Sequence, residues 1–232
     1  PPAPGFNAEA SDPEAIALAD SVMDAIGGRQ AWDDTRVIAW SFFGRRHLIW
    51  DKHSGDVRID APGDSTIFLI NIFNNQGKVR KGEIEVTGAS LDTLLDQAKR
   101  YWINDSYWLV MPFKLKDSGV TLKYLRDEDN EAGQPSYILQ LTFDSVGVTP
   151  QNAYEVWVDK RDHLIKQWAF YREATQEEPN FVRPWDNNRQ YGEIILSADR
   201  SDQGGPAHVR VMDSVPEAVF QNWDVPAWVP AL

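Results

Sequence analysis

The feature that most constrains this fold is a change of hydrophobic period at Thr35. From that residue onward, apolar and polar side chains alternate in short β-rich runs, the pattern of strands that bury one face. Turn residues separate neighbouring runs, as at Gly44, Pro62-Gly63-Asp64 and Asn74-Asn75-Gln76-Gly77. Because connections this short join antiparallel neighbours, the pattern predicts antiparallel sheet rather than alternating strand and helix.

The alternating runs predict about eleven strands. We place them at 35–43, 46–52, 56–60, 66–73, 78–86, 119–125, 136–143, 153–159, 164–173, 189–199 and 207–213. The expected fold class is mainly antiparallel β with α (α+β). A twisted sheet of this many strands curls, so we expect one curved, unclosed half-barrel with a concave face.

Two helices are predicted to cover that concave face. The first begins after Ser11 or Asp12, carries Pro13 at its first position, and ends at Gly27-Gly28. The second follows Ser90 and keeps its apolar face to Trp102. A shorter helical turn is expected at 106–110, closed by Met111-Pro112.

The chain divides into three predicted parts. Residues 1–12 are rich in Pro, Ala and Gly and favour a flexible tether. Residues 13–215 are expected to form one domain. The remainder, 216–232, is a Pro-rich aromatic tail that either covers an open edge or apolar groove, or frays.

Composition excludes several functions. The chain has no cysteine, so disulfides, thiolate catalysis and Cys-ligated metals are excluded. Its formal net charge is −12, which disfavours binding to nucleic acid, and the longest basic run is Arg45-Arg46. No apolar run approaches the roughly 20 residues that span a bilayer.

Three stretches carry a family resemblance. They are the hairpin from Tyr154 to Tyr171, the pair of motifs Trp50-Asp51-Lys52 and Gly55-Asp56-Val57-Arg58, and the run from Asn104 to Leu115. With the helix that ends in Ile26-Gly27-Gly28 and the following Trp32, they resemble bacterial outer-membrane lipoprotein-sorting proteins of the LolA/LolB-like class. The similarity spans residues 13–213, and the nearest members are uncharacterised exported bacterial proteins.

This resemblance implies a non-enzymatic, exported protein that is periplasmic or associated with the outer membrane. In that class an eleven-stranded half-barrel holds a hydrophobic ligand, so the implied partner is a lipid, a hydrophobic small molecule or the acyl chain of a lipoprotein. It also implies a lipid-anchored N-terminus, although no lipobox cysteine is present. No cofactor or nucleic-acid partner is implied, a monomer is expected, and no residue here matches the lid-locking arginine of the class.

Large apolar side chains are the candidate lining of such a cavity. The expected ligand-binding residues are Trp50, Leu95, Trp102, Trp108, Met111, Phe113 and Trp168. Aromatic rings and methionine bury much area and adapt to irregular ligands. The same residues could instead form an ordinary core, and which strand faces point into the concavity stays open at this point.

Metal binding is not expected. His47 and His53 could approach Asp51 and Asp56 across a hairpin, but solvated histidines are favoured. The acidic run 127–131 fails as a calcium loop, because Ile138 occupies the position where a bidentate Glu is required.

A carbohydrate-active protein is the main alternative. It would be a Trp-platform binding module or a two-carboxylate glycoside hydrolase, with exposed tryptophan beside an acid at Trp50-Asp51, Trp157-Asp159 or Trp185-Asp186. Glu83 and Glu85 share a strand face, as do Glu155 and Asp159, and neighbours two apart on such a face are separated by about 6.5 Å. A structural lipoprotein that docks a protein partner is a further alternative.

Overall fold

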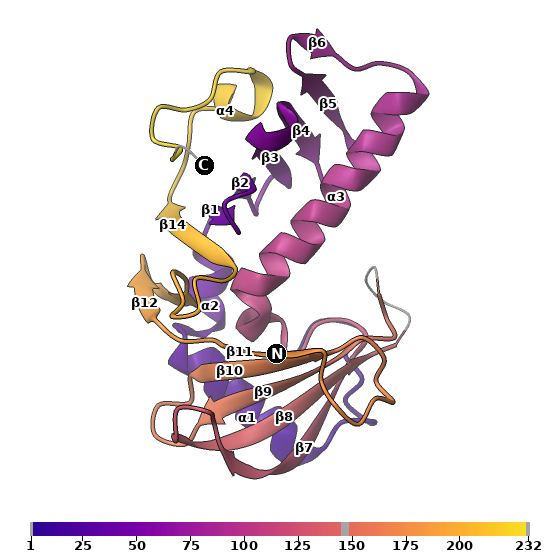
Figure 1. Cartoon of the computed structure of the whole chain (residues 1–232). Helices are drawn as coiled ribbons and strands as arrows, with labels where there is room; N and C mark the ends of the chain where they lie inside the picture. The colour runs from indigo at the N-terminus through magenta and orange to yellow at the C-terminus, as the bar shows by residue number, and fades with distance from the viewer. Residues whose placement is uncertain (1, 145–148, 231–232) are drawn as a thin grey trace. The chain divides into compact units, whose positions relative to one another are not determined.

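The computed structural model describes residues 2–144 and 149–230. These residues fall into two compact units (Figure 1). The first unit draws on Pro1–Trp32, Val110–Arg189 and Ile194–Gln203, and the second on Asp33–Leu109, Gln190–Glu193 and Gly204–Leu232. The segment 13–215, predicted from the sequence to form one domain, contributes to both units.

The second unit is built on a seven-stranded antiparallel sheet with the order β14-β1-β2-β3-β4-β5-β6 among the described residues. Its strands are β1 (Val37–Phe42), β2 (Arg46–Asp51), β3 (Asp56–Ala61), β4 (Thr66–Asn71), β5 (Gln76–Lys81), β6 (Ile84–Glu85) and β14 (Pro206–Met212). Two helices belong to it, α3 (Ala89–Val110) and α4 (Ala218–Gln221), and a 3₁₀ turn, η1, spans Pro62–Asp64. In Figure 1, α3 runs along one side of this sheet and α4 lies on the other.

The first unit is built on a five-stranded antiparallel sheet with the order β11-β10-β9-β8-β7 in the described part of the chain. Its strands are β7 (Val120–Asp129), β8 (Pro135–Phe143), β9 (Ala153–Asp159), β10 (Ile165–Tyr171) and β11 (Phe181–Pro184). Helix α1 (Pro13–Ala25) lies against β7 and the 3₁₀ turn η2 (Met111–Lys114), and α2 (Gly28–Asp34) follows α1. A two-stranded sheet pairs β12 (Asn188–Tyr191) with β13 (Ile194–Ser197).

The predicted fold class is confirmed: the described residues form mainly antiparallel sheets that are not closed into a barrel, with a long central helix. The sheets differ from the prediction in continuity, because the strands divide among three sheets instead of one of about eleven strands. The reason lies in the pairing of β1, which has β2 on one side and the last strand, β14, on the other. Between β6 and β7 the chain forms α3 and η2. Strands β7 to β11 then pair with one another in a sheet of their own.

The N-terminal segment differs from the predicted tether. The backbone N–H groups of Ala3 and Asn7 donate to the carbonyls of Lys116 and Val120, at 3.0 and 3.1 Å. Asp12 then accepts a bond from the backbone N–H of Tyr124 at 3.0 Å. Because these bonds satisfy backbone groups at the start of β7, the segment is part of the first unit.

The C-terminal tail covers one face of the seven-stranded sheet, which we call the tail face and define by Val37, Ala39 and Ile49. These side chains are buried in one cluster together with Val219, Phe220, Trp228 and other tail residues. Arg58, fully buried on the same face, donates to the backbone carbonyls of Val219, Asn222 and Trp223 at 3.2, 2.8 and 3.2 Å. The tail is therefore a docked strap rather than a frayed end.

Candidate functional site

The opposite face of the seven-stranded sheet, which we call the α3 face, is apolar across five strands. Its residues follow from the register, which places Ile38 opposite Trp50, Trp50 opposite Val57, and Val57 opposite Ile70. The buried members are Ile38, Trp40, Phe42, Leu48, Trp50, Val57, Ile59, Phe68, Ile70 and Val79. Strand alternation thus gathers large apolar side chains on one surface.

Helix α3 lies on this face through aromatic pairs. The ring of Trp102 meets that of Trp50 edge-on, with centroids 5.2 Å apart. Tyr101 meets Phe68 at 6.0 Å, and Trp108 meets Phe42 at 5.8 Å. Residues 101, 105 and 108 are spaced three or four apart, so they share one side of the helix. The rings therefore form a row of edge-to-face contacts between helix and sheet.

One ion pair interrupts this apolar contact. Arg46 of β2 donates to both carboxylate oxygens of Asp105 on α3, at 2.6 and 2.9 Å, and Asp105 is fully buried. The guanidinium also lies 4.1 Å from the ring centroid of Tyr101 and 5.5 Å from that of Phe42. Burial raises the pKa of Asp105, against the opposing effect of the Arg46 guanidinium. The pair fixes the position of α3 along the sheet at a cost in desolvation.

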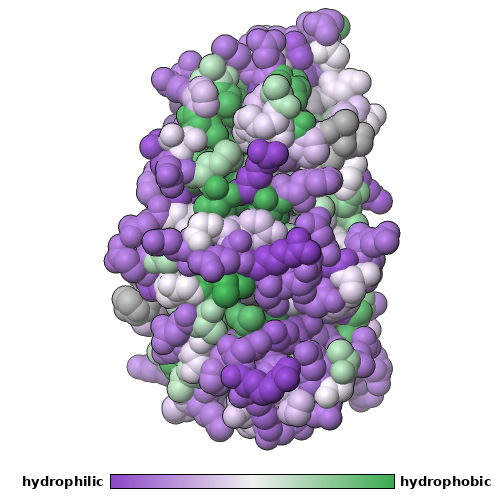
Figure 2. All heavy atoms as spheres, turned by 90° about the vertical axis from the view of Figure 1, so that its left-hand side faces the viewer, coloured by the Kyte–Doolittle hydropathy of each residue, from purple (hydrophilic) through white to green (hydrophobic). Residues whose placement is uncertain are grey.

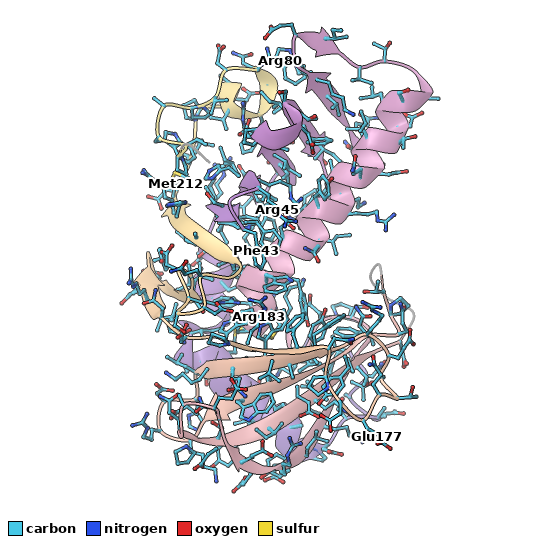
Figure 3. The ribbon with its side chains drawn as sticks, viewed as in Figure 1. Phe43, Arg45, Arg80, Glu177, Arg183 and Met212 are labelled. Carbon is cyan, nitrogen blue, oxygen red and sulfur yellow. The ribbon has the colours of Figure 1, made fainter. Side chains whose placement is uncertain are left out.

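The β1–β2 turn lies beside the C-terminal end of α3. Figure 3 shows Phe43 and Arg45 on this turn. The ring of Phe43 is 5.3 Å from that of Trp108, while Phe43 itself is 37% exposed. This end of the α3 face is therefore closed by a partly solvated aromatic side chain.

The predicted lining residues separate into two groups. Trp50, Leu95, Trp102 and Trp108 lie on the α3 face or on α3, in the second unit. Met111, Phe113 and Trp168 lie in the first unit, on η2 and β10. Of the seven residues, Trp50 and Trp102 contact each other. That the seven line one ligand-binding cavity stays a prediction.

The residues of the first-unit group belong to aromatic clusters of their own. Trp168 stacks on Tyr154, with centroids 5.4 Å apart, and meets Trp185 at 5.2 Å. Burial raises the pKa of Tyr154 to about 12. Phe113 stacks on Trp32 at 4.4 Å. These rings are well packed within the first unit.

The ion pair of Arg46 with Asp105 was not predicted from the sequence. Arg46 lies in the longest basic run, Arg45-Arg46, and Asp105 lies within the Asn104–Leu115 motif. Nothing in either stretch indicates pairing, because the two residues are 59 positions apart and meet only when β2 and α3 come together.

Histidine is placed differently from the expectation. His47, expected to be solvated, is 1% exposed, and its Nδ1 lies 3.1 Å from the hydroxyl of Ser41, which also lies 3.1 Å from Nδ1 of His208. Burial, followed by the nearby His208, lowers the pKa of His47 to about 4. The described residues contain no group of three or more His, Asp or Glu side chains placed to hold a metal ion.

The three tryptophans expected to act as sugar platforms are not exposed. Trp50, Trp157 and Trp185 are 9%, 4% and 1% exposed. The carboxylates beside them are also occupied: Glu155 binds Arg126 at 3.2 Å, and Asp159 accepts from the backbone N–H of Arg161 at 2.8 Å. These positions therefore do not form the open, acid-flanked groove that the carbohydrate alternative required.

Among the described residues, no helix combines the length and the apolar character needed to cross a bilayer.

Comparisons with known proteins give similarity in structure only. No protein-family model matches the chain, and no curated protein matches it significantly in sequence.

A DUF1329 family protein from Desulfovibrio piger is 13% identical, with a TM-score of 0.47 over 91% of this chain and 98% of its own. A domain described as an outer-membrane lipoprotein-sorting protein, from Vibrio parahaemolyticus, is 11% identical, with a TM-score of 0.46 over 89% and 96%. A LolA superfamily protein from Nitrosomonas europaea is 11% identical, with a TM-score of 0.35 over 87% and 96%. Lipoprotein-sorting and LolA superfamily proteins, the class that the sequence motifs resemble, are thus among the structures similar to this chain.

Proposed function

We propose that this protein is a non-enzymatic, exported carrier or holder of a hydrophobic ligand, such as an acyl chain, a lipid or the lipid part of a lipoprotein. The observation that carries the proposal is the α3 face, an apolar surface across five strands that is interrupted by Arg46 and covered by one helix. The sequence resemblance supports the same function and a periplasmic or outer-membrane-associated location.

The ligand would lie between the sheet and α3, in contact with apolar side chains of both. Each methylene group buried there contributes about 0.8 kcal/mol, so a long chain can bind without a strong polar contact. Affinity would then depend on chain length more than on headgroup. Specificity among hydrophobic ligands would be low, because apolar burial is non-directional.

One polar atom on α3 could orient such a ligand. The indole Nε1 of Trp102 is buried and has no hydrogen-bond partner among the described residues. A buried donor without a partner is costly, and the oxygen of an ester or carboxyl group would satisfy it. We therefore expect an acyl ligand to place its carbonyl near Trp102.

The test combines native mass spectrometry with a binding titration. Protein purified without detergent is expected to carry lipid, and 11-(dansylamino)undecanoic acid is expected to bind with a dissociation constant of about 1 μM, corresponding to about 8 kcal/mol. Trp102→Ala should weaken this probe about tenfold, through lost ring contact and a lost donor. Trp157→Phe, in the five-stranded sheet, is the matched control and should leave binding unchanged.

Two results would contradict the proposal. One is the absence of both co-purified lipid and probe binding in the folded protein. The other is probe binding that Trp102→Ala leaves unchanged but Trp157→Phe abolishes, since the ligand would then lie elsewhere.

A further inference from the structure

A second site lies on the tail face, on the other side of the sheet from α3. It is an open groove with a volume of about 690 Å³, within the range of small-molecule sites. Strands β3, β4 and β5 form its floor, and α4 with the residue after it forms a wall. The lining residues are Asp56, Leu69, Ile70, Asn71, Asn74, Gln76, Gly77, Lys78, Phe220, Gln221 and Asn222.

Amide side chains dominate the lining of this groove. Five of its eleven residues carry a carboxamide: Asn71, Asn74, Gln76, Gln221 and Asn222. The exposed amides of Gln76 and Asn222 each present a donor and an acceptor side by side, which matches the vicinal hydroxyl groups of a sugar. The two charged lining residues, Asp56 and Lys78, have opposite signs, so the lining favours a ligand without net charge.

The floor is held rigid before any ligand arrives. The amide of Asn71 donates to the carbonyl of Ser54 and to the carboxylate of Asp56, both at 2.9 Å. Its oxygen accepts from the backbone N–H of Phe73 at 3.1 Å, and Asn74 Oδ1 accepts from that of Gln76 at 2.9 Å. A floor fixed in this way loses little entropy on binding.

The wall is held by Arg58, whose bonds to the carbonyls of Val219 and Asn222 fix the strap that carries α4. Leu69 and Phe220 add apolar area beside the amides. Sugar rings have apolar C–H faces as well as hydroxyl edges, so a lining of amides with a few apolar side chains complements both.

An acyl chain fits the groove less well than a sugar does. An acyl chain would offer no hydrogen-bond partner to the exposed amides of Gln76 and Asn222.

We propose that this groove is a binding site for a neutral oligosaccharide. The proposal goes beyond the ligand of the α3 face and does not depend on it, because the two sites lie on opposite faces of the sheet.

Isothermal titration calorimetry with maltotriose, cellotriose and triacetylchitotriose tests the proposal on the full chain. At least one of these neutral trisaccharides is expected to bind with a dissociation constant of about 1 mM or below. The double variant Gln76→Ala/Asn222→Ala should weaken it about tenfold, because two exposed amides are lost without disturbing the fold. Gln151→Ala/Gln190→Ala, which changes two exposed amides outside the groove, should leave binding unchanged.

Failure of all three sugars to bind the folded protein would overturn the proposal. So would sugar binding that survives in the Gln76→Ala/Asn222→Ala variant. The fatty-acid titration is independent of both outcomes, so a failed sugar site and a failed acyl site remain distinguishable.

Discussion

Several polar side chains are buried on the tail face, among them His47 and Arg58. His47 is enclosed with Ser41 and lies opposite Asp60 in the β2–β3 register, while Arg58, Arg210 and His208 disfavour its protonation. The ring of Trp228 in the strap lies 6.2 Å from its imidazole. A histidine in this setting is neutral in the folded protein well below its ordinary pKa.

His47 should therefore make the protein sensitive to acid. Its pKa falls from 6.5 to about 4 on folding, so between these values the unfolded chain binds the extra proton. The free energy of unfolding is then expected to decrease by about 3 kcal/mol as the pH falls through this window. Urea unfolding from pH 7 to pH 4 should show a shallower slope in His47→Gln, and no change of slope in His163→Asn. Identical slopes in all three proteins would contradict this assignment.

Gly77 is required by a close backbone approach. A Cβ atom at this position would lie 2.1 Å from the carbonyl oxygen of Leu69 and 2.8 Å from Cα of Ile70. Backbone cannot move aside as a flexible side chain can, so Gly77→Ala should destabilise the protein by about 2 kcal/mol or more. Gly63→Ala, where a Cβ meets nothing within 4 Å, is the matched control. Thermal unfolding measures both, and equal melting temperatures would refute the prediction.

At the scale of elements, α3 is joined to its sheet by apolar rings and by one charged pair. Arg46→Ala should cost about 3 kcal/mol, because it leaves the buried carboxylate of Asp105 without its partner. Asp105→Asn should cost less, since a neutral amide needs less solvation. Urea denaturation measures both, and Arg45→Ala, an exposed neighbour, should change stability by no more than about 0.5 kcal/mol.

The pH dependence gives this ion pair an independent check. Asp105 has a raised pKa, so its protonated form is favoured in the folded state and its contribution to stability declines as the pH rises through that pKa. Loss of Arg46 should therefore destabilise more at pH 7 than at pH 4. An equal loss at both values would indicate that the carboxyl is solvated in the variant.

The strap is the second element whose role can be tested. Removing residues 216–232 uncovers Val37, Ala39 and Ile49 and takes three carbonyl partners from Arg58. The truncated protein should lose about 3 kcal/mol or more of stability and bind the dye ANS. Val225→Ser, which changes a strap residue that is 52% exposed, should do neither. Unchanged stability on truncation would mean that the strap contributes nothing to the fold.

Local sequence patterns were sufficient for most elements of this fold. Strand β9 spans the predicted 153–159, and α1 spans Pro13–Ala25 against a predicted end at Gly27-Gly28. The predicted strand 78–86 instead divides into β5 and β6, because Gly82 turns the chain with φ +55°. Helix α3 continues where two helical pieces were predicted. The residues between the two predicted pieces include Asp105, whose buried carboxylate is paired with Arg46.

The candidate site was predictable only in part. Helical spacing predicted that Leu95 and Trp102 share the apolar side of the second helix, while Trp50 was open to a role in either a ligand site or the core. The ion pair of Arg46 with Asp105 and the groove beneath α4 depend on contacts between residues distant in sequence. No local pattern indicates such contacts.

At the scale of the whole molecule, the two units are interleaved along the chain. The first unit needs residues before 33 and after 109, and Trp32 stacks on Phe113 with centroids 4.4 Å apart. A short Gly/Ser linker can therefore join residue 32 to residue 110. The fusion of 1–32 to 110–203 should fold and give a near-UV circular dichroism signal, whereas 110–203 alone lacks α1 and should not. A well-folded 110–203 fragment would show that α1 is dispensable.

The hold of Arg58 on the strap has a consequence for how this protein can change over evolutionary time. The guanidinium binds main-chain carbonyl oxygens, which every amino acid has. Its hydrogen bonds therefore do not depend on which side chains residues 219, 222 and 223 carry. Val219 is buried against the sheet and the Trp223 ring lies 4.8 Å from Lys78 Nζ, whereas Asn222 is exposed, so substitutions can accumulate at residue 222 without releasing the end of the chain. The wall of the groove is thus free to acquire new side chains, and with them new ligands, on an unchanged anchor.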